Sequence, residues 1–294
     1  MVNAHIGLTY ACNMNCKHCY VKEKIHKKVH INTDILLEKL EQFGTFYITY
    51  TMGETLLWKG FSEFATKAKN KGFYQILLSN GSTIQSDSTV DRLVDMGIKK
   101  VGISIDSSYE NVHDANRNYS GAHKLACNAI SLLSKQSSIL TQVTVTIGNH
   151  NLDDVVNIIE SMEKIGANSF SFLWMRGACG IVPIEDIEKY EKVMRTLILK
   201  KNDAILDINV HDHRMNPLVN KMYESGEISL QTKEDLLNMN NCHALSELVL
   251  IDPSGDMYVC NFAKRPFANI YSTPLEEIAR YSCKEKSVCD MCCK

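Results

Sequence analysis

The chain has 294 residues, of which 45% are hydrophobic and 22% charged, and 32 Lys and Arg residues nearly balance 34 Asp and Glu residues. A net charge of −2 provides no basic surface for nucleic acid or an acidic membrane, and the apolar content is that of a globular protein. There is no secretory signal by the usual pattern, and no apolar stretch near the ~20 residues that cross a bilayer. These features predict a cytoplasmic protein without nucleic-acid or membrane partners.

Strand-like and helix-like segments alternate through the first 200 residues. The expected strands are Ile6–Tyr10, Phe46–Thr51, Phe73–Ser79, Val101–Asp106, Gln142–Ile147 and Ser169–Trp174. Apolar residues at helical spacing predict helices over Thr33–Phe43, Phe61–Lys71, Ser88–Met96, Ala122–Leu133, Asp153–Ile165 and Glu185–Lys200. Glycines that commonly end helices follow four of these, at Gly44, Gly72, Gly97 and Gly166.

Six successive strand–helix units predict an α/β fold with a parallel sheet. The units end near residue 200, whereas a closed eight-unit barrel usually needs ~250 residues. We therefore expect a partial (β/α)6 barrel, with an open doubly wound sheet as the alternative. In either fold, ligands bind at the carboxyl ends of the strands.

The remainder of the chain predicts a smaller C-terminal domain. Ile205–Val210 reads as a further strand and Val219–Leu237 as a broken helix. The turn sequence Asp252-Pro253-Ser254-Gly255 predicts a hairpin, which a short helix at Pro274–Tyr281 follows. The expected division is a partial barrel over 1–200, a connecting segment over 201–240 and a small domain with a β-hairpin, a helix and an iron–sulfur cluster over 241–294.

Eleven cysteines are unusual for a cytosolic chain, where they are more often metal ligands or redox groups than disulfides. Cys12, Cys16 and Cys19 directly follow the first predicted strand. Three thiolates in a short loop can hold three irons of a cubane cluster and leave the fourth iron open for chemistry. The alternative is a zinc knuckle with His18 or His30 as the fourth ligand, although zinc sites usually use C-x2-C pairs.

The segment CNMNCKHCY resembles the C-x3-C-x2-C loop of the radical S-adenosylmethionine (SAM) enzymes. The resemblance implies a [4Fe–4S] cluster whose open iron binds SAM. It also implies reductive cleavage of SAM to a 5′-deoxyadenosyl radical that abstracts a substrate hydrogen. A reduced flavodoxin or ferredoxin is then the expected electron donor.

Further motifs of the family follow the next strands. The turn Met52-Gly53-Glu54-Thr55 resembles the family's G-G-E-P turn, although Met52 and Thr55 depart from it. The resemblance implies that Glu54 binds the amino group of SAM, with Gly53 in the same turn. Asn80, in Ser79-Asn80-Gly81, corresponds to the family's T-N-G motif after the third strand.

A fourth motif continues the pattern. Ser104-Ile105-Asp106, followed by His113-Asp114 and Arg117, resembles the family's S-L-D and H-D-x-x-R residues. The resemblance implies that Ser104 and Arg117 contact the carboxylate or ribose of SAM, and Asn151 is a further polar candidate. The physical requirement agrees, because a zwitterionic methionine moiety needs an anion for its ammonium and a cation for its carboxylate.

The second group of cysteines lies at the other end of the chain. It resembles the C-terminal extension called SPASM or, in its shorter form, twitch, which binds auxiliary [4Fe–4S] clusters. The segment is too short for the two-cluster form, so we expect one cluster bound by Cys242, Cys260, Cys289 and Cys292. Cys283 or Cys293 is an alternative to one of these ligands, and a structural zinc site is an alternative to the cluster.

Two other features invite functional interpretations. Cys179 follows the sixth predicted strand, where a thiol can donate a hydrogen atom to a substrate radical, although a small buried residue between glycines is the plainer interpretation. His211-Asp212-His213 suggests metal binding, but without an evident third ligand we expect a surface loop.

The sequence thus predicts a radical SAM enzyme that modifies a ribosomally made peptide by cross-linking, epimerisation or oxidation. Oxidation or epimerisation of an aminoglycoside, a sugar or another small molecule is the first alternative. A non-enzymatic iron–sulfur electron carrier is the second. Because the chain begins close to its first strand, a domain that binds the peptide leader is expected to be a separate protein.

Overall fold

A computed structural model describes residues 2–25, 27–29, 31–177, 180–203, 205–240, 248–261, 263 and 265–280. The chain divides into two compact units. The first unit comprises Met1–Ser79, Ser86–Val101 and His243–Lys294, and the second comprises Asn80–Gln85 and Gly102–Cys242. One division between the units, after Cys242, lies close to the domain boundary expected at 241, and no division lies near 200. The expected three-part domain division stays a prediction.

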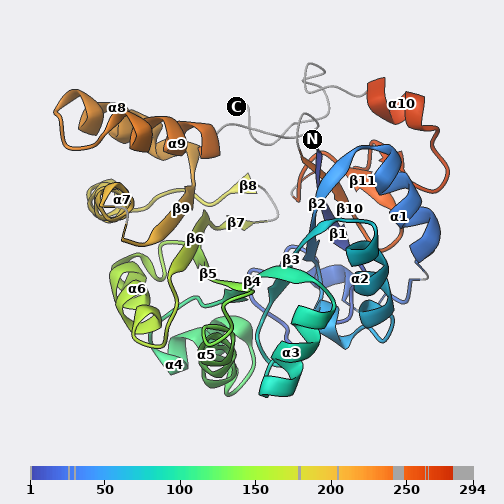
Figure 1. Ribbon diagram of the computed structural model, residues 1–294. Coiled ribbons are helices and arrows are strands. Elements are labelled where there is room, and N and C mark those ends of the chain that lie inside the picture. Colours follow the sequence, from blue (N-terminus) through green and yellow to red (C-terminus); the bar gives the residue numbers. More distant parts are fainter. Residues whose placement is uncertain are drawn as a thin grey trace. The chain divides into compact units, whose positions relative to one another are not determined.

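In the first unit, the first strand of the chain lies in one sheet with strands from residues 248–269 (Figure 1). Four parallel strands lie in the order β10 (Leu248–Ile251), β1 (Val2–Gly7), β2 (Thr45–Thr51) and β3 (Tyr74–Ser79). Antiparallel strands β11 (Asp256–Tyr258) and β12 (Ala268–Asn269) extend this sheet beyond β10. Its helices are α1 (Thr33–Gln42), α2 (Phe61–Asn70), α3 (Asp87–Asp95) and α10 (Leu275–Arg280).

The second unit also combines parallel strands with helices. Strands β5 (Leu140–Ile147), β6 (Ser169–Trp174) and β9 (Asp207–His211) are parallel and lie in that order. Its helices are α4 (Glu110–Arg117), α5 (Ala122–Leu133), α6 (Val155–Glu163), α7 (Ile187–Asn202), α8 (Asn216–Glu224) and α9 (Leu230–Asn240). A short hairpin pairs β7 (Arg176–Gly177) with β8 (Gly180–Ile181). Strand β4 (Ile98–Ser104) contains the division between the units.

Short 3-10 helices connect several of these elements. They are η1 (Lys22–Lys24), η2 (Thr55–Leu57), η3 (Leu152–Asp154) and η4 (His213–Met215). The first lies between the cysteine-bearing segment and α1, and the second follows β2 directly.

Local sequence signals account for the ends of the helices. The Asn32 side chain accepts a hydrogen bond from the Ile35 amide at the start of α1, as an N-cap does. The four glycines expected to end helices all have positive φ angles, for example 66° at Gly44 and 83° at Gly72. Buried aliphatic side chains on the strands, including Ile6, Ile48 and Leu77, contribute to the core.

The predicted α/β class with parallel strands is confirmed, and the bounds of β6 and α5 are those predicted. The first strand ends at Gly7 rather than Tyr10, because pairing with β2 stops at the Gly7–Thr51 pair. Helix α4 has no counterpart in the prediction. Its buried face carries His113 and Arg117, so apolar periodicity is absent there.

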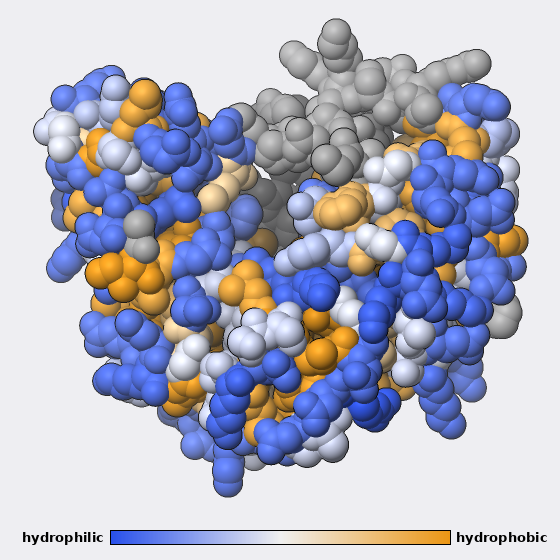
Figure 2. All heavy atoms as spheres, viewed as in Figure 1, coloured by the Kyte–Doolittle hydropathy of each residue, from blue (hydrophilic) through white to orange (hydrophobic). Residues whose placement is uncertain are grey.

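Within the described ranges, no helix combines the length and the hydrophobicity that crossing a membrane requires. Figure 2 shows a mostly hydrophilic face, with hydrophobic residues scattered between polar ones.

Candidate functional site

The three N-terminal cysteines lie on an irregular loop between β1 and η1, here called the cysteine loop (residues 11–21). The Cys19 amide donates to the Cys16 carbonyl at 3.3 Å, and the Met14 amide donates to Cys12 Sγ at 3.5 Å. All three thiols are half-buried. Burial, together with the nearby Glu54, Cys16 and Cys19 side chains, raises the pKa of Cys12 to about 11. Glu54 and the other two cysteines therefore lie close enough to Cys12 to interact with it electrostatically.

The donor set of the cysteine loop indicates which group it can hold. Within the described ranges, no three His, Cys, Asp or Glu side chains are arranged to bind one metal ion. Cluster thiolates bind different irons, so they need not surround a single point. Three sulfur ligands suit iron–sulfur or other soft-metal chemistry rather than magnesium or calcium. The residues present therefore fit a cluster with three protein ligands.

A strained turn after β2 packs directly on the cysteine loop. Met52 and Gly53 have φ angles of 63° and 54°, in the left-handed region. A Cβ atom on Gly53 would lie 2.6 Å from the Ala11 carbonyl oxygen and 2.7 Å from that of Thr9. Only glycine fits this contact without displacement of the loop backbone.

Glu54 is placed by this turn. Its amide donates to the Ala11 carbonyl at 2.8 Å, and its carboxylate accepts a hydrogen bond from Ser79 Oγ at 3.0 Å. The residue is 1% exposed, and Ser79 ends β3. A buried carboxylate is costly unless donors or cations surround it, so this position suits an ammonium group.

A second polar group lies in the second unit, around Asp106. Arg117 Nη2 donates to Asp106 Oδ1 at 2.8 Å, and the Asp106 amide donates to His113 Nδ1 at 3.0 Å. All three residues are buried. Burial lowers the pKa of His113 to about 4, and the Arg117 charge adds to the decrease. The imidazole is therefore neutral near pH 7, with Nδ1 as acceptor.

Asn151 belongs to the same group. Its Nδ2 donates to the carbonyl oxygens of Asp106 at 2.7 Å and Thr146 at 3.0 Å, while Oδ1 accepts from the Gly148 amide at 2.8 Å. The side chain therefore ties together the segments that follow β4 and β5. Contact between Asn151 and a cofactor stays a prediction.

The other predicted site residues are distributed between the units. Cys12, Cys16, Cys19, Gly53 and Glu54 lie together in the first unit, and Asn80, Ser104, Arg117 and Asn151 belong to the second. Asn80 and Ser104 are half-buried, and Asn80 Oδ1 accepts from the Ser82 amide at 2.9 Å. Cys260, also predicted as a ligand, follows β11 and is half-buried. Cys179, Cys242, Cys283, Cys289, Cys292 and Cys293 lie outside the described residues.

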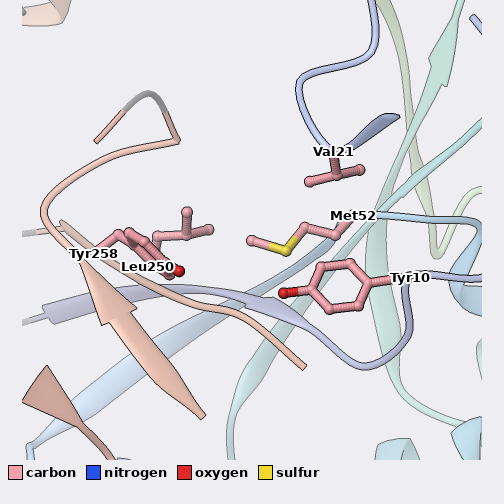
Figure 3. Close-up of a cluster of buried hydrophobic side chains, with 5 residues drawn as sticks. All are labelled: Tyr10, Val21, Met52, Leu250 and Tyr258. Carbon is pink, nitrogen blue, oxygen red and sulfur yellow. The ribbon is translucent and has the colours of Figure 1, made fainter. Parts of the chain in front are cut away.

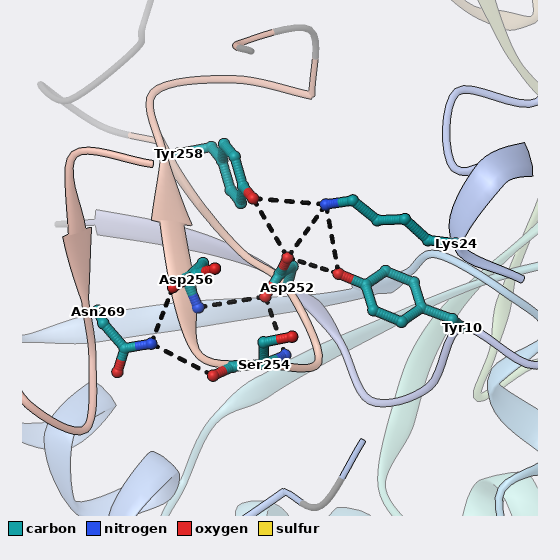
Figure 4. A network of polar contacts seen from close by, with 7 residues as sticks. All are labelled: Tyr10, Lys24, Asp252, Ser254, Asp256, Tyr258 and Asn269. Carbon is teal, nitrogen blue, oxygen red and sulfur yellow. Dashed lines mark hydrogen bonds and ion pairs between the residues drawn. The ribbon is translucent and has the colours of Figure 1, made fainter. Parts of the chain in front are cut away.

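The sequence prediction missed a buried network around Asp252, which directly follows β10 (Figure 4). The Tyr10 hydroxyl donates to Asp252 Oδ2, which also accepts from Lys24 Nζ and the Tyr258 hydroxyl, each at 3.4 Å. Asp252 is 4% exposed. The turn motif identified this aspartate only as part of a hairpin, because its partners are far away in the sequence.

An apolar cluster lies beside this network. Tyr10 and Val21, which flank the cysteines, pack with Met52 of the strained turn and with Leu250 and Tyr258 of the C-terminal hairpin (Figure 3). The two ends of the cysteine loop therefore share one buried environment.

The surface loop expected at His211-Asp212-His213 requires correction. Both histidines are exposed, but Asp212 is buried. Its carboxylate accepts hydrogen bonds from the Tyr190 hydroxyl at 2.9 Å and from Arg214 Nε and Nη2 at 2.9 and 2.8 Å. The aspartate thus anchors a polar network rather than lying in solvent.

Comparisons with known proteins show what the chain resembles. The model of the radical SAM superfamily matches residues 6–162. The sporulation killing factor maturation protein SkfB of Bacillus subtilis (strain 168) is 32% identical over 172 residues, covering 58% of this chain and 41% of SkfB. The subtilosin biosynthesis protein AlbA of the same strain is 24% identical over 288 residues, covering 94% of this chain and 59% of AlbA. The chain thus spans about half the length of these two relatives.

A solved structure shows the same fold over nearly the whole chain. Streptococcus suis SuiB, bound to its precursor peptide SuiA, matches with a TM-score of 0.74 and covers 96% of this chain and 65% of SuiB. The sequence identity is 11%, so this likeness concerns the fold alone.

Proposed function

The chain belongs to the radical SAM superfamily, and we propose that it uses radical chemistry to modify a ribosomally made peptide. The enzymes of this family use SAM and a [4Fe–4S] cluster, which together supply a 5′-deoxyadenosyl radical for hydrogen abstraction. The proposed outcome is a cross-link, an epimerisation or an oxidation of a residue in the peptide.

One observation carries the assignment of the site. A buried glutamate lies beside a loop with three cysteines, on a turn whose glycine leaves no room for a side chain. Cys12, Cys16 and Cys19 would hold the cluster, and Glu54 would accept the ammonium group of SAM. Ser79 orients that carboxylate through its hydroxyl.

The family resemblance implies further residues for binding SAM. Arg117 would supply positive charge for the carboxylate of SAM, and Asp106 fixes the guanidinium through a buried ion pair. Ser104 and Asn80 would offer hydrogen bonds to the ribose or the carboxylate. His113 contributes no charge near pH 7, so the net charge of this group comes from Asp106 and Arg117.

The peptide substrate is supported by the kind of protein that the chain resembles. SkfB is named for maturation of the sporulation killing factor, AlbA for biosynthesis of the bacteriocin subtilosin, and SuiB was solved with a precursor peptide. The expected partners are a flavodoxin or ferredoxin and a separate protein that binds the peptide leader. A small-molecule substrate, such as an aminoglycoside or sugar, is the alternative.

We further propose an auxiliary [4Fe–4S] cluster bound by Cys242, Cys260, Cys289 and Cys292. In an alternative ligand set, Cys283 or Cys293 would replace one of these four cysteines. A structural zinc ion is the competing assignment. A cluster with four thiolates would transfer electrons or stabilise the C-terminal segment. Cys179 is proposed as a hydrogen-atom donor to the substrate radical.

Iron and sulfide content after anaerobic reconstitution tests these assignments. We expect about eight irons in the parent and about four in the triple variant Cys12→Ala, Cys16→Ala, Cys19→Ala, which should form no 5′-deoxyadenosine. In the matched variant Cys260→Ala, iron should fall while the signal of the N-terminal cluster persists. About four irons in the parent and none in the triple variant would refute the auxiliary cluster. SAM cleavage by the triple variant would refute the site itself.

A further inference from the structure

The cysteine loop is held at both of its ends. Tyr10 lies two residues before Cys12 and is 2% exposed, and Val21 lies two residues after Cys19 and is 7% exposed. Both pack in the apolar cluster with the C-terminal hairpin (Figure 3). The hairpin therefore contacts the chain on either side of the three thiols.

One carboxylate connects these two ends. Asp252 Oδ2 accepts hydrogen bonds from Tyr10 before the first cysteine and from Lys24 after the third (Figure 4). The Lys24 ammonium also lies 5.5 and 5.3 Å from the ring centroids of Tyr10 and Tyr258, at cation–π range. The interactions of Asp252 thus join three segments that the sequence keeps far apart.

Asp252 is itself fixed in place. Its Oδ1 accepts hydrogen bonds from the amides of Ser254 at 2.9 Å and Asp256 at 3.1 Å. Its backbone amide donates to the Asp256 carbonyl, and the preceding residue Ile251 is paired with Ile6 of β1. The position of the carboxylate that binds both ends of the loop is therefore fixed by the sheet and by these backbone amides.

We propose that Asp252 is a positioning residue for the cysteine loop: through Tyr10 and Lys24 it fixes where the three thiols stand before any cluster binds. The inference rests on the proposed function only in taking these thiols as cluster ligands. Asp252 acts through other residues and touches no reacting atom. Ordering the loop in advance lowers the conformational entropy that cluster binding must otherwise remove.

The test begins with the cluster-free protein, so that it does not depend on activity. Iodoacetamide alkylation of each thiol is followed by peptide mass spectrometry in the parent and in the Asp252→Asn and Tyr10→Phe variants. We expect Cys12, Cys16 and Cys19 to react several-fold faster in both variants, because the loop opens more often. Cys127 of the second unit is the internal reference and should react at an unchanged rate.

A matched control separates this effect from a general loss of stability. Tyr190→Phe removes a buried tyrosine hydroxyl that also donates to an aspartate, in the second unit. This variant should leave the alkylation rates of all three loop thiols at the parent value. After reconstitution, Asp252→Asn should also change the electron paramagnetic resonance signal of the reduced SAM-bound cluster, and Tyr190→Phe should not.

The outcomes separate the inference from the proposed function. Folded Asp252→Asn and Tyr10→Phe variants with parental alkylation rates and spectra would overturn the role of Asp252, while SAM cleavage by the parent would keep the proposed function. A parent that cleaves no SAM would refute the proposed function, and the alkylation rates would still decide the inference. If Asp252→Asn does not fold, Tyr10→Phe and Lys24→Met decide it, since each removes only one link to the carboxylate.

Discussion

The two units of the molecule contain the same polar arrangement, built in different ways. In each, a buried aspartate directly follows the outermost parallel strand, Asp252 after β10 and Asp212 after β9. Each carboxylate accepts a hydrogen bond from a tyrosine hydroxyl and another from a cationic side chain. That cationic side chain lies over two aromatic rings.

The difference between the two arrangements lies in the origin of their partners. Arg214, whose guanidinium forms two hydrogen bonds to Asp212, is two residues away in the sequence, and Tyr190 is 22 residues away. Lys24 and Tyr10, by contrast, are 228 and 242 residues from Asp252. The network of the second unit therefore stabilises a local segment. The network of the first unit instead joins an N-terminal segment to a segment more than 200 residues later.

The largest expected contrast between the units concerns their thiols. Cys16→Ala should abolish 5′-deoxyadenosine formation, because the loop then offers two ligands to a cluster that needs three. Cys127→Ala, in helix α5 of the second unit, should leave formation at the parent rate. Chromatographic assay of 5′-deoxyadenosine after reduction measures both, and product from the Cys16 variant would contradict the assignment of the loop.

Among these substitutions, removal of Asp212 should have the largest effect on stability. In Asp212→Ala the Arg214 guanidinium, which is 22% exposed, loses a bidentate partner, and Tyr190 loses its acceptor. We expect the free energy of unfolding to fall by about 3 kcal/mol. Urea denaturation followed by circular dichroism measures the change. A loss below about 1 kcal/mol would show that the ion pair contributes little.

The second unit should also be the acid-sensitive one. The pKa of His113 is about 4 in the folded chain, below its ordinary value of 6.5, because of burial and the Arg117 charge. As the pH falls, His113 therefore binds a proton in the unfolded chain at a higher pH than in the folded chain. The stability contributed by neutral His113 is full above pH 6.5 and is lost as the pH falls toward 4. The loss should reach about 3 kcal/mol.

The control for this pH effect is His113→Gln, whose amide oxygen can still accept the Asp106 hydrogen bond without titrating. Its unfolding free energy should depend less on pH between 6.5 and 4 than that of the parent. Denaturation curves across this range compare the two proteins. Equal slopes would show that His113 does not control the acid response.

The smallest effect on stability is expected at Lys24. Its side chain is 36% exposed, so solvent screens its ion pair with Asp252. Lys24→Met should lower the free energy of unfolding by less than about 1 kcal/mol, well below the loss in Asp212→Ala. Denaturant titration compares the two variants. An equal loss would remove the distinction between the more exposed lysine and the less exposed arginine.

Periodicity and spacing predicted much of the fold and part of the site. The helices with apolar stripes and the strand Ser169–Trp174 were predicted because burial of aliphatic side chains leaves a regular pattern. The cysteine loop was visible because its three cysteines are neighbours in the sequence. Helix α4 was missed because its buried residues are His113 and Arg117, and Asp252 was missed because no local pattern reveals partners more than 200 residues away.

The pairing of β10 with β1 has a consequence for how the protein is made. One edge of β1 pairs with β2, but its other edge receives β10 only after residues 248–251 have been synthesised. At roughly 5–20 residues per second, that edge waits for tens of seconds on the ribosome. Tyr10 and Lys24 lack Asp252 during this interval, so the cysteine loop takes its final form late. Insertion of iron and sulfide is therefore expected to follow the synthesis of residues 248–252 rather than that of the cysteine loop itself.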